Sequence, residues 1–371
     1  MDCDAAVIGA GICGLAAALA LERRSLRTVV LERHTPGSGA SGRNAGYLMR
    51  GAAENYAAAC RTYGRTRAGH LWRWSEKNLH GLRAEGIDDL PSYRAMPSCL
   101  VAFHEAELEE LGQSLTLLRE DGFAAEWIDR GEDSLWKSGR ALGGLINPHD
   151  ATVNPQELVR MLASRLRGGI YENQEVFEVV PEKDHVLIAA ADLRIRAGRV
   201  MVCLNAYAGT LFPALASVVA PRRGQMLALA APEVRLDYAY YADHGSEYFR
   251  EAPAPPEGLV VIGGRRKYFA EAEIGLDDSP TDAVQTSIEE YASALFGKRY
   301  PVVARWAGIM GFSPDGLPLV GPIDEAEPRI WFCGGFTGHG MSLAFETARA
   351  AVASMLEGAE NPFPLSRVGR Q

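Results

Sequence analysis

A glycine-rich turn near the start of the chain constrains its fold more than any other feature. The turn reads Gly9-Ala10-Gly11-Ile12-Cys13-Gly14. It follows the apolar run Ala5–Ile8 and precedes Leu15–Leu21, which favours helix, and a second apolar run leads into Glu32. Strand, turn, helix, strand and acid stand in the order of a dinucleotide-binding βαβ unit. A lone glycine motif is weak evidence, but this context makes the unit a specific prediction.

Each of these residue types has a physical reason to stand where it does. Gly9 permits the tight turn, Gly11 lets the backbone approach a pyrophosphate, and Gly14 lets the helix pack closely on the strand. The helix N-terminus offers free N–H groups to phosphates. Glu32 can accept hydrogen bonds from a ribose 2′-hydroxyl, and its charge argues against a 2′-phosphorylated ligand.

The bulk composition is that of a globular protein long enough for two domains. The chain has 371 residues, of which 47% are hydrophobic and 23% are charged. Its net charge of −9 disfavours a nucleic-acid partner. The six cysteines are scattered without a C-x-x-C pair. We therefore expect free buried thiols, with no metal site and no disulfide framework.

The apolar N-terminus does not have the pattern of a signal peptide, because Asp2 and Asp4 stand where basic residues are needed. No apolar run in the sequence reaches the roughly 20 residues of a membrane span. These features favour a cytoplasmic protein without a membrane-spanning segment.

Apolar periodicity predicts an alternation of helices and strands. Helices are expected at 50–90, 105–120, 155–166 (with Asn154 as N-cap), 281–296 and 342–356. Strands are expected at 175–180, 185–188, 199–204, 225–229, 247–250, 259–262 and 330–333, with a hairpin loop at 253–256. The predicted fold is α/β. A Rossmann-type nucleotide domain is formed by 1–75, 145–215 and 305–371, with an inserted β-rich α+β substrate domain at 76–144 and 216–304.

Further motifs extend the signal along the whole chain. In order, they are the glycine turn with Glu32, then residues 40–46, 204–207, 221–226, 306–318 and 335–340. Together these blocks resemble the D-amino acid oxidase superfamily of FAD-dependent oxidoreductases, which includes glycine oxidase and sarcosine oxidase. Residues 41–46 and Tyr248-Phe249-Arg250 are most similar to the gamma-glutamylputrescine oxidase branch.

The resemblance implies a flavoprotein in which the second glycine block lies at the pyrimidine end of the flavin. The implied FAD-binding residues are Gly9, Gly11, Ile12, Cys13, Gly14, Glu32, Arg33, Ser41, Arg43, Asn44, Ala45, Gly46, Val176, Asn205, Ala206, Gly308, Gly335, Phe336, Gly338, His339, Gly340 and Met341. Relatives attach FAD through a Cys at the position near Gly308, or through a His in the block that matches 41–46. Neither nucleophile stands there in this chain, so FAD is expected to be held non-covalently.

The resemblance also implies oxidation of a C–N bond in an amine or amino acid. A hydride equivalent passes to flavin N5, and the resulting imine is hydrolysed. Candidate residues for the reaction are Arg50, Tyr248, Arg250 and His339. The sequence leaves open whether His339 shapes its turn, hydrogen-bonds the flavin or transfers a proton.

Two departures from the relatives bear on the substrate. Met310 stands where glycine oxidase has a carboxylate-binding Arg, and Ser342 stands where sarcosine oxidase has a carboxylate-binding Lys. The loss of these cations disfavours a small α-amino acid and favours a larger amine. A distal acid group of that amine could reach Arg50 or Arg250. The alternative is that both arginines are solvated surface charges.

Other interpretations remain open from the sequence. The electron acceptor stays open between oxygen and another oxidant. The Lys linked to oxygen reduction in sarcosine oxidase falls near Val261 here, but glycine oxidase lacks that Lys as well. An NAD-dependent dehydrogenase would explain residues 5–32 but not the second glycine block. A non-catalytic flavoprotein subunit of a larger oxidoreductase is a third possibility. The sequence determines neither the amine nor the oligomeric state.

Overall fold

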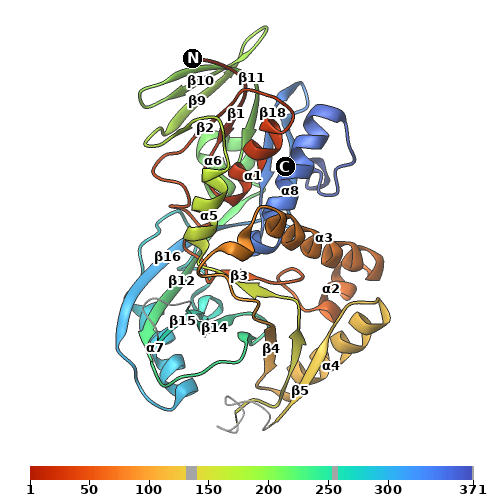
Figure 1. The fold of residues 1–371 in the computed structure, drawn as a ribbon, viewed down its shortest axis with the longest axis vertical. Helices are drawn as coiled ribbons and strands as arrows, with labels where there is room; N and C mark the ends of the chain where they lie inside the picture. The colour runs from red at the N-terminus through yellow and green to blue at the C-terminus, as the bar shows by residue number, and fades with distance from the viewer. Residues whose placement is uncertain (131–139, 253–257, 370–371) are drawn as a thin grey trace.

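The computed structural model describes residues 1–130, 140–252 and 258–369 (Figure 1). One lobe is built on a mainly parallel sheet and the other on a mainly antiparallel sheet, and the chain crosses between them repeatedly. The hairpin loop predicted at 253–256 lies outside the described residues.

The first sheet contains the predicted βαβ unit. β1 (Asp2–Ile8) pairs in parallel with β2 (Thr28–Leu31) and with β11 (Arg194–Val202). α1 (Ile12–Glu22) joins β1 to β2 and is buried along its whole length, since α8 (Gly340–Glu357) packs against it. The sheet also contains β18 (Glu327–Gly334), β17 (Leu319–Asp324), β8 (Ile170–Tyr171), β10 (Val186–Ala190) and β9 (Val176–Pro181).

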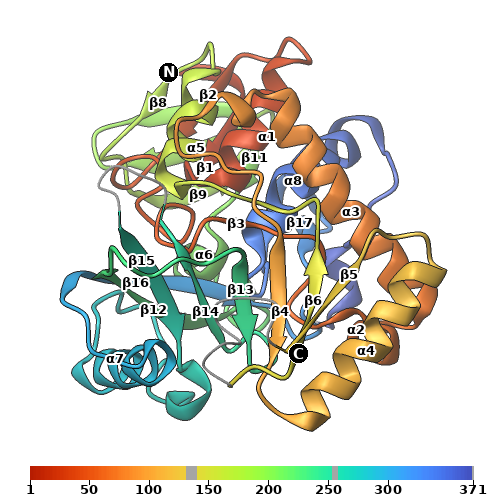
Figure 2. The same ribbon diagram turned by 60° about the horizontal axis from the view of Figure 1, so that its bottom comes forward.

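The second sheet forms the other lobe (Figure 2). Its strands, in spatial order, are β16 (Val302–Phe312), β12 (Ala220–Ala230), β15 (Leu259–Gly264), β14 (Glu247–Glu251), β13 (Ala239–Ala242), β4 (Ser98–Ala102), β6 (Gly143–Asn147) and β5 (Glu126–Asp129). α7 (Asp282–Phe296) packs against β12 and β15, and α4 (Glu105–Glu120) packs against β4 and β6. This sheet supplies the wall that faces the second glycine block.

Shorter elements link the lobes. β3 (Tyr47–Leu48) pairs with β7 (Ala151–Thr152), and α3 (Arg65–Ala84) packs along α8. The other α-helices are α2 (Tyr56–Tyr63), α5 (Pro155–Ser164) and α6 (Ala208–Leu211). Short 3₁₀ turns occur at Ile87–Asp89, Asn205–Tyr207, Pro213–Leu215, Arg266–Phe269 and Leu365–Arg367.

Most predicted elements are confirmed where local signals were strong. The helix at 105–120 has the predicted bounds, and Asn154 caps α5 by accepting the Gln156 N–H at 3.0 Å. The helical region 50–90 is divided at Gly64, whose φ of 83° is left-handed. The strands that were not predicted include β4, β5, β6 and β13, whose apolar runs are short and obtain their burial from neighbours distant in sequence, and also β3, β7, β16 and β17.

Sheet membership bears on the proposed domain boundaries. β16 pairs along its length with β12 of the second sheet, although 305–371 was assigned to the nucleotide domain. Likewise, β6 pairs with β4 and begins before the expected boundary at 145. The division into a nucleotide domain and a substrate domain remains a proposal, with its third segment starting after Phe312.

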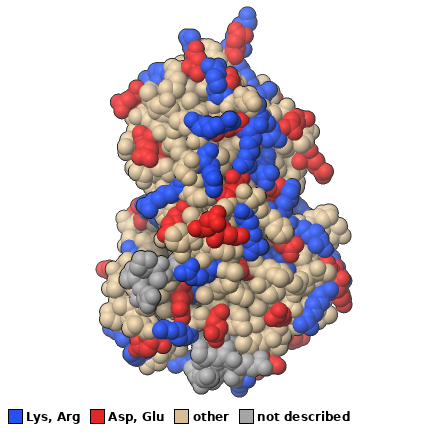
Figure 3. Space-filling view, in the orientation of Figure 1, with Lys and Arg blue, Asp and Glu red and all other residues tan. Residues whose placement is uncertain are grey.

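All six cysteines are free thiols in the structure; five are buried as expected, and Cys60 is half-buried. No helix in the described ranges combines the length and the apolar character that crossing a bilayer demands. On the face drawn in Figure 3, acidic and basic side chains lie side by side rather than forming a continuous basic surface.

Candidate active site

A deep cavity opens at the carboxyl ends of β1 and β2 and extends to the start of α8. Its empty volume is about 1470 Å³, part of which is open to solvent. Predicted residues that line it are Gly9, Gly11, Ile12, Cys13, Glu32, Arg33, Ser41, Arg43, Asn44, Val176, Asn205, Phe336, Gly338, Gly340 and Met341. We call this space the first cavity. Its position, where parallel strands end at a glycine turn, is that of a nucleotide site.

The glycine turn between β1 and α1 admits no side chain at its critical positions. Gly9 has a φ of 103°, and a Cβ at Gly14 would lie 1.8 Å from the carbonyl oxygen of Gly9. A Cβ at Gly11 would lie 2.8 Å from Ser41 Oγ, which accepts the Ile12 N–H at 3.0 Å. The turn thus has the close backbone approach that a pyrophosphate requires.

Glu32 is held in position at the end of β2 by backbone donors. Its Oε2 accepts the N–H of Ala10 at 2.8 Å, and its Oε1 accepts the N–H of His34 at 3.0 Å. The carboxylate therefore faces the glycine turn and borders the first cavity. Because carboxylate oxygens can accept further hydrogen bonds, Glu32 fits the role of a ribose acceptor.

The loop at 37–46 forms one side of the cavity and is braced by its own side chains. The Asn44 amide donates to the carbonyls of Ala40 (3.0 Å) and Ser41 (2.9 Å), and its oxygen accepts the Gly46 N–H at 2.7 Å. Arg43 forms an ion pair with Asp278 and so ties the loop to the second lobe.

The second glycine block connects β18 to α8. The Gly335 N–H donates to Asn205 Oδ1 at 2.8 Å, and Thr337 and Gly338 have φ values of 48° and 84°. His339 stands at the N-terminus of α8, with its Nδ1 3.3 Å from the Thr337 carbonyl. Burial lowers the pKa of His339, so its imidazole is neutral at pH 7.

The second cavity adjoins the first and has an empty volume of about 1300 Å³. The two share Ala40, Arg43, Asn44, Met310, Gly338 and Met341. The second cavity is also lined by Ala45, Gly308, His339, Ser342 and Tyr248. Burial raises the pKa of Tyr248 to about 12, and its ring stacks on Tyr241 at 5.7 Å. Met310 and Ser342 thus both face the space next to the shared wall.

Four of the predicted cofactor residues support the site from behind. Gly14, Gly46, Ala206 and Gly335 line neither the first nor the second cavity within the described chain. Gly46 permits close packing, since a Cβ there would lie 1.9 Å from the Val153 carbonyl oxygen.

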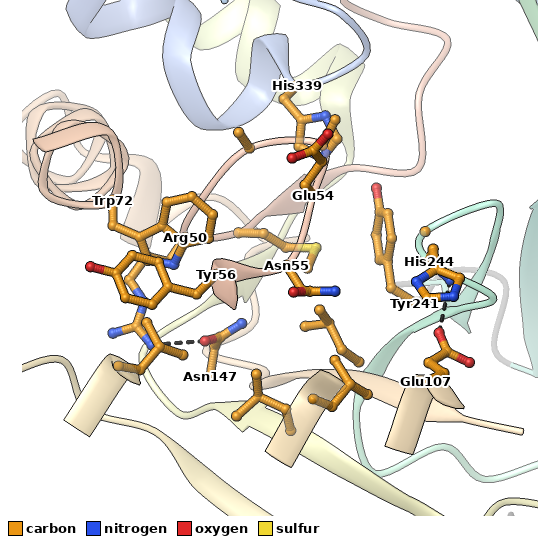
Figure 4. A pocket seen from close by; sticks show the side chains of 18 residues that line it. Arg50, Glu54, Asn55, Tyr56, Trp72, Glu107, Asn147, Tyr241, His244 and His339 are labelled. Carbon is orange, nitrogen blue, oxygen red and sulfur yellow. Dashed lines mark hydrogen bonds between the residues drawn. The ribbon is translucent and has the colours of Figure 1, made fainter. Parts of the chain in front are cut away.

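A third, smaller cavity adjoins His339, and its empty volume of about 580 Å³ includes space that is open to solvent. It shares Met49, Ala53, Tyr241, His244, Gly245 and His339 with the second cavity. Figure 4 shows Arg50, Tyr56 and Trp72 on one side of it and Tyr241, His244 and Glu107 on the other. Leucine side chains form much of the remaining wall, namely Leu100, Leu111, Leu118 and Leu145.

Arg50 lines the third cavity, but most of its donors are already used. Nη2 donates to the Ala124 carbonyl (2.6 Å) and to Asn147 Oδ1 (2.7 Å), and Nη1 lies 3.3 Å from Glu76 Oε1. The side chain is 4% exposed, and its Nε has no hydrogen-bond partner among the described residues. Arg50 is therefore a buried structural cation and not a solvated charge.

Arg250 is also buried, with 3% of its surface exposed. It donates to the carbonyls of Ala45 (2.6 Å), Glu251 (2.8 Å) and Val153 (3.1 Å). Within the described chain it borders none of the three cavities. The geometry thus joins Arg250 to the loop that carries Ala45 and does not bring it to the place where a substrate could bind.

Part of the wall of the second cavity was not predicted from the sequence. Arg266 and Lys267 line it just after β15, and Tyr241, His244 and Phe312 line it from other segments. A signal existed for the first two, because the basic run 265–267 follows a predicted strand and two glycines. No local pattern marks the other three as neighbours.

Comparison with known proteins agrees with this geometry. Residues 4–354 match the DAO family, described as FAD dependent oxidoreductase. A glycine oxidase from Pseudomonas aeruginosa is 25% identical over 98% of both chains. A probable oxidoreductase, OrdL, from Rhizobium meliloti is 27% identical over 92% of this chain and 80% of that protein. The crystal structure of glycine oxidase from Geobacillus kaustophilus has a TM-score of 0.79 at 21% identity, covering 100% of this chain and 98% of that one.

The family match extends through the second glycine block, which an NAD-dependent dehydrogenase would not explain. That alternative is therefore wrong, and the resemblance to the D-amino acid oxidase superfamily is confirmed. The chain belongs to the DAO family of FAD-dependent oxidoreductases.

Proposed function

We propose that this protein oxidises the C–N bond of an amine or amino acid whose chain is longer than that of glycine. The observation that supports it is the adjacency of the three cavities, which share lining residues. The first meets the second at Met310, Gly338 and Met341, and the second meets the third at His339. A substrate in the second cavity would therefore lie beside the cofactor with space beyond it for a longer chain.

The residues present fit FAD. The glycine turn and the start of α1 suit its pyrophosphate, Glu32 suits its ribose, and the Gly338–Met341 turn at the start of α8 suits the electron-rich end of its ring. When bound, FAD supplies the two-electron acceptor that no side chain provides. Because neither family attachment position holds a Cys or His, we propose non-covalent binding.

His339 is suited to receive the substrate's proton. Its Nδ1 faces the Thr337 carbonyl, which can only accept a hydrogen bond, so Nδ1 carries the hydrogen and Nε2 keeps its lone pair. Amine oxidation requires an uncharged nitrogen, whereas amines in water are mainly ammonium ions. The lowered pKa keeps His339 uncharged at pH 7 but also makes it a weak base, so it can take that proton only transiently and pass it on to solvent.

The aromatic wall of the second cavity limits water and orients the substrate. Tyr47, Tyr241 and Tyr248 pack against one another, with Tyr47–Tyr241 centroids 5.1 Å apart. Tyr248 lines the second cavity, which counts against a non-catalytic subunit, whereas Arg50 is tied up by structural contacts and Arg250 borders none of the three cavities in the described chain. Oxygen and other oxidants stay possible acceptors. Membership of the gamma-glutamylputrescine oxidase branch stays a proposal that rests on residues 41–46 and 248–250.

The test is anaerobic bleaching of the flavin in the purified holoenzyme. We expect extended primary or secondary amines to bleach it faster than glycine, sarcosine or D-alanine. Met310 and Ser342 leave a carboxylate beside the reacting carbon without a cation, which costs several kcal/mol, on the order of 100-fold or more in specificity. Efficient turnover of glycine or D-alanine would contradict the proposal, as would a flavin that no amine reduces.

A further inference from the structure

Arg266 stands in an unusual position at the edge of the second cavity. β15 ends at Gly264, and Arg265 follows with a left-handed φ of 64°. The Arg265 side chain turns away, with its Nη1 3.2 Å from Glu247 Oε1 and its Nε 3.1 Å from Ser287 Oγ. The 3₁₀ turn then starts with Arg266, which lines the second cavity.

The second cavity has a charge imbalance. Its basic lining residues are Arg43, His244, Arg266, Lys267 and His339, and no described Asp or Glu lines it. Three of these have acids close by, in the pairs Arg43–Asp278, Lys267–Asp243 and His244–Glu110. Burial keeps His339 neutral at pH 7.

Arg266 differs from all of them. Within the described chain it has neither an ion pair nor a hydrogen bond, and its guanidinium carbon lies 4.8 Å from the centroid of the Phe312 ring. Contact with a ring uses no hydrogen-bond acceptor, so the guanidinium donors remain free. Desolvation lowers the pKa of the half-buried Arg266, although the negative charges of Tyr248 and Glu273 act to raise it. Its partner is therefore expected to come from a ligand.

The position of this cation along β16 limits where a ligand's anionic group can lie. Met310 and Phe312 are two residues apart on the strand, so their side chains share a face and are spaced by about 7 Å. Met310 belongs to the wall that the first and second cavities share, whereas Phe312 and Arg266 line only the second. The free cation is therefore displaced from the shared wall.

We propose that Arg266 binds the carboxylate of the substrate, and that this acid group is separated from the oxidised carbon by a spacer. The inference rests on the proposed amine oxidation and specifies its substrate class as amines with a distal acid. A planar guanidinium offers paired donors that match a carboxylate, and such charged hydrogen bonds are strong in a partly desolvated cavity. Arg266 thus supplies the cation that Met310 and Ser342 do not.

The binding test uses compounds that the enzyme cannot oxidise. Hexanoate and hexanamide are titrated into the holoenzyme, and the perturbation of the flavin absorption spectrum gives each dissociation constant. We expect wild type to prefer hexanoate, and Arg266→Gln to lose about 10- to 100-fold of that preference, as for removal of a charged hydrogen-bond partner. Arg222→Gln is the matched control. It removes a nearby positive charge that lines none of the three cavities in the described chain, and it should keep the preference.

The substrate test uses ω-amino acids of increasing length and their amides, with anaerobic flavin bleaching as the readout. Arg266→Gln should slow bleaching by the longer acids while changing their amides less than about threefold. Arg266→Lys, which keeps the charge but loses the paired donors, should retain part of the acid preference. If Arg266→Gln does not bind FAD, Arg266→Lys provides the test in its place.

The outcomes separate the two proposals. If amines bleach the flavin and Arg266→Gln leaves the acid-to-amide ratios unchanged, the Arg266 inference is overturned and amine oxidation stands. If no amine bleaches the flavin but hexanoate binds in an Arg266-dependent way, the anion site stands and amine oxidation is rejected. A wild type that binds hexanoate and hexanamide equally would also overturn the inference.

Discussion

The sequence specifies the two main cavities of this protein in different ways. We call the lining of the first cavity the nucleotide end and the lining of the second cavity the substrate wall. The nucleotide end consists mainly of short contiguous segments, such as the glycine turn and the second glycine block. The substrate wall takes single residues from distant segments, including Tyr47, Gly224, Tyr248, Arg266 and Phe312. A site formed by the backbone of one short segment leaves a recognisable pattern in the sequence. A cavity wall formed by side chains from several strands does not, because those side chains come together only when the strands pair.

The largest expected effect is at the nucleotide end. Gly14→Ala should abolish FAD binding and soluble expression, because its Cβ would lie 1.8 Å from the Gly9 carbonyl oxygen. Gly112→Ala in α4 is the matched control, since a Cβ there meets nothing within 4 Å and should stabilise the helix by about 0.5–1 kcal/mol. Flavin content and thermal unfolding measure both. A Gly14→Ala protein with full flavin content would show that the turn tolerates a side chain.

Arg50→Ala tests whether Arg50 only stabilises the fold around the third cavity or also binds substrate there. We expect a loss of about 3–5 kcal/mol in unfolding free energy, because Glu76, Asn147 and the Ala124 carbonyl lose a buried charged partner. Bleaching rates for acidic and uncharged amines should fall by equal factors. A selective loss for acidic amines would return Arg50 to the substrate-binding role considered from sequence.

Asp150 makes the junction between the lobes sensitive to pH. It accepts the Arg50 N–H at 2.9 Å and the Ser98 hydroxyl at 2.5 Å, and burial raises its pKa to about 7. A raised carboxyl pKa means that its stabilising contribution is fully present below about pH 4 and is lost as pH rises through 7. Between pH 5 and 8, wild type should lose about 2–3 kcal/mol more unfolding free energy than Asp150→Asn. Urea unfolding at both pH values checks this, and parallel profiles would contradict it.

Glu32→Ala should weaken FAD binding by about 1–3 kcal/mol, the value of a charge-assisted hydrogen bond to a buried hydroxyl. The FAD affinity of Glu32→Gln should fall between those of wild type and Glu32→Ala, because an amide oxygen can still accept one hydrogen bond. The dissociation constant of FAD, measured by fluorescence titration of the apoprotein, decides the matter. An unchanged value for Glu32→Ala would place the ribose contact elsewhere.

The smallest effect concerns a local signal far from the chemistry. Asn154→Ala removes the side chain that accepts the Gln156 N–H at the start of α5, and should cost about 1 kcal/mol. FAD affinity and amine preference should not change. A large loss of either would mean that this cap also supports the first cavity. The distinction between features set by nearby residues and features set by tertiary contacts would then be less sharp.

The same contrast explains which predictions from sequence were correct. The βαβ unit, the α5 cap and the helix at 105–120 depend on neighbours close in sequence, so their patterns were visible. Arg50 and Arg250 were chosen by type and position, but their partners come from Asn147 and from the Val153 carbonyl. No spacing in the sequence indicates that the Asn147 side chain and the Val153 carbonyl accept hydrogen bonds from these two guanidinium groups.

The sequence by itself determined the dinucleotide turn, the acid after β2 and the family, because backbone geometry at a glycine depends on the residue itself and its nearest neighbours. Only the tertiary structure decided that, of four arginines near the cavities, Arg266 alone has no ion pair or hydrogen bond within the described residues. Arg43, Arg50, Arg250 and Arg266 are the same residue type, and three of them are neutralised or hydrogen-bonded by groups that the fold brings from elsewhere. Whether a charge is available to a ligand depends on such long-range pairing, which arises only when the sheets assemble.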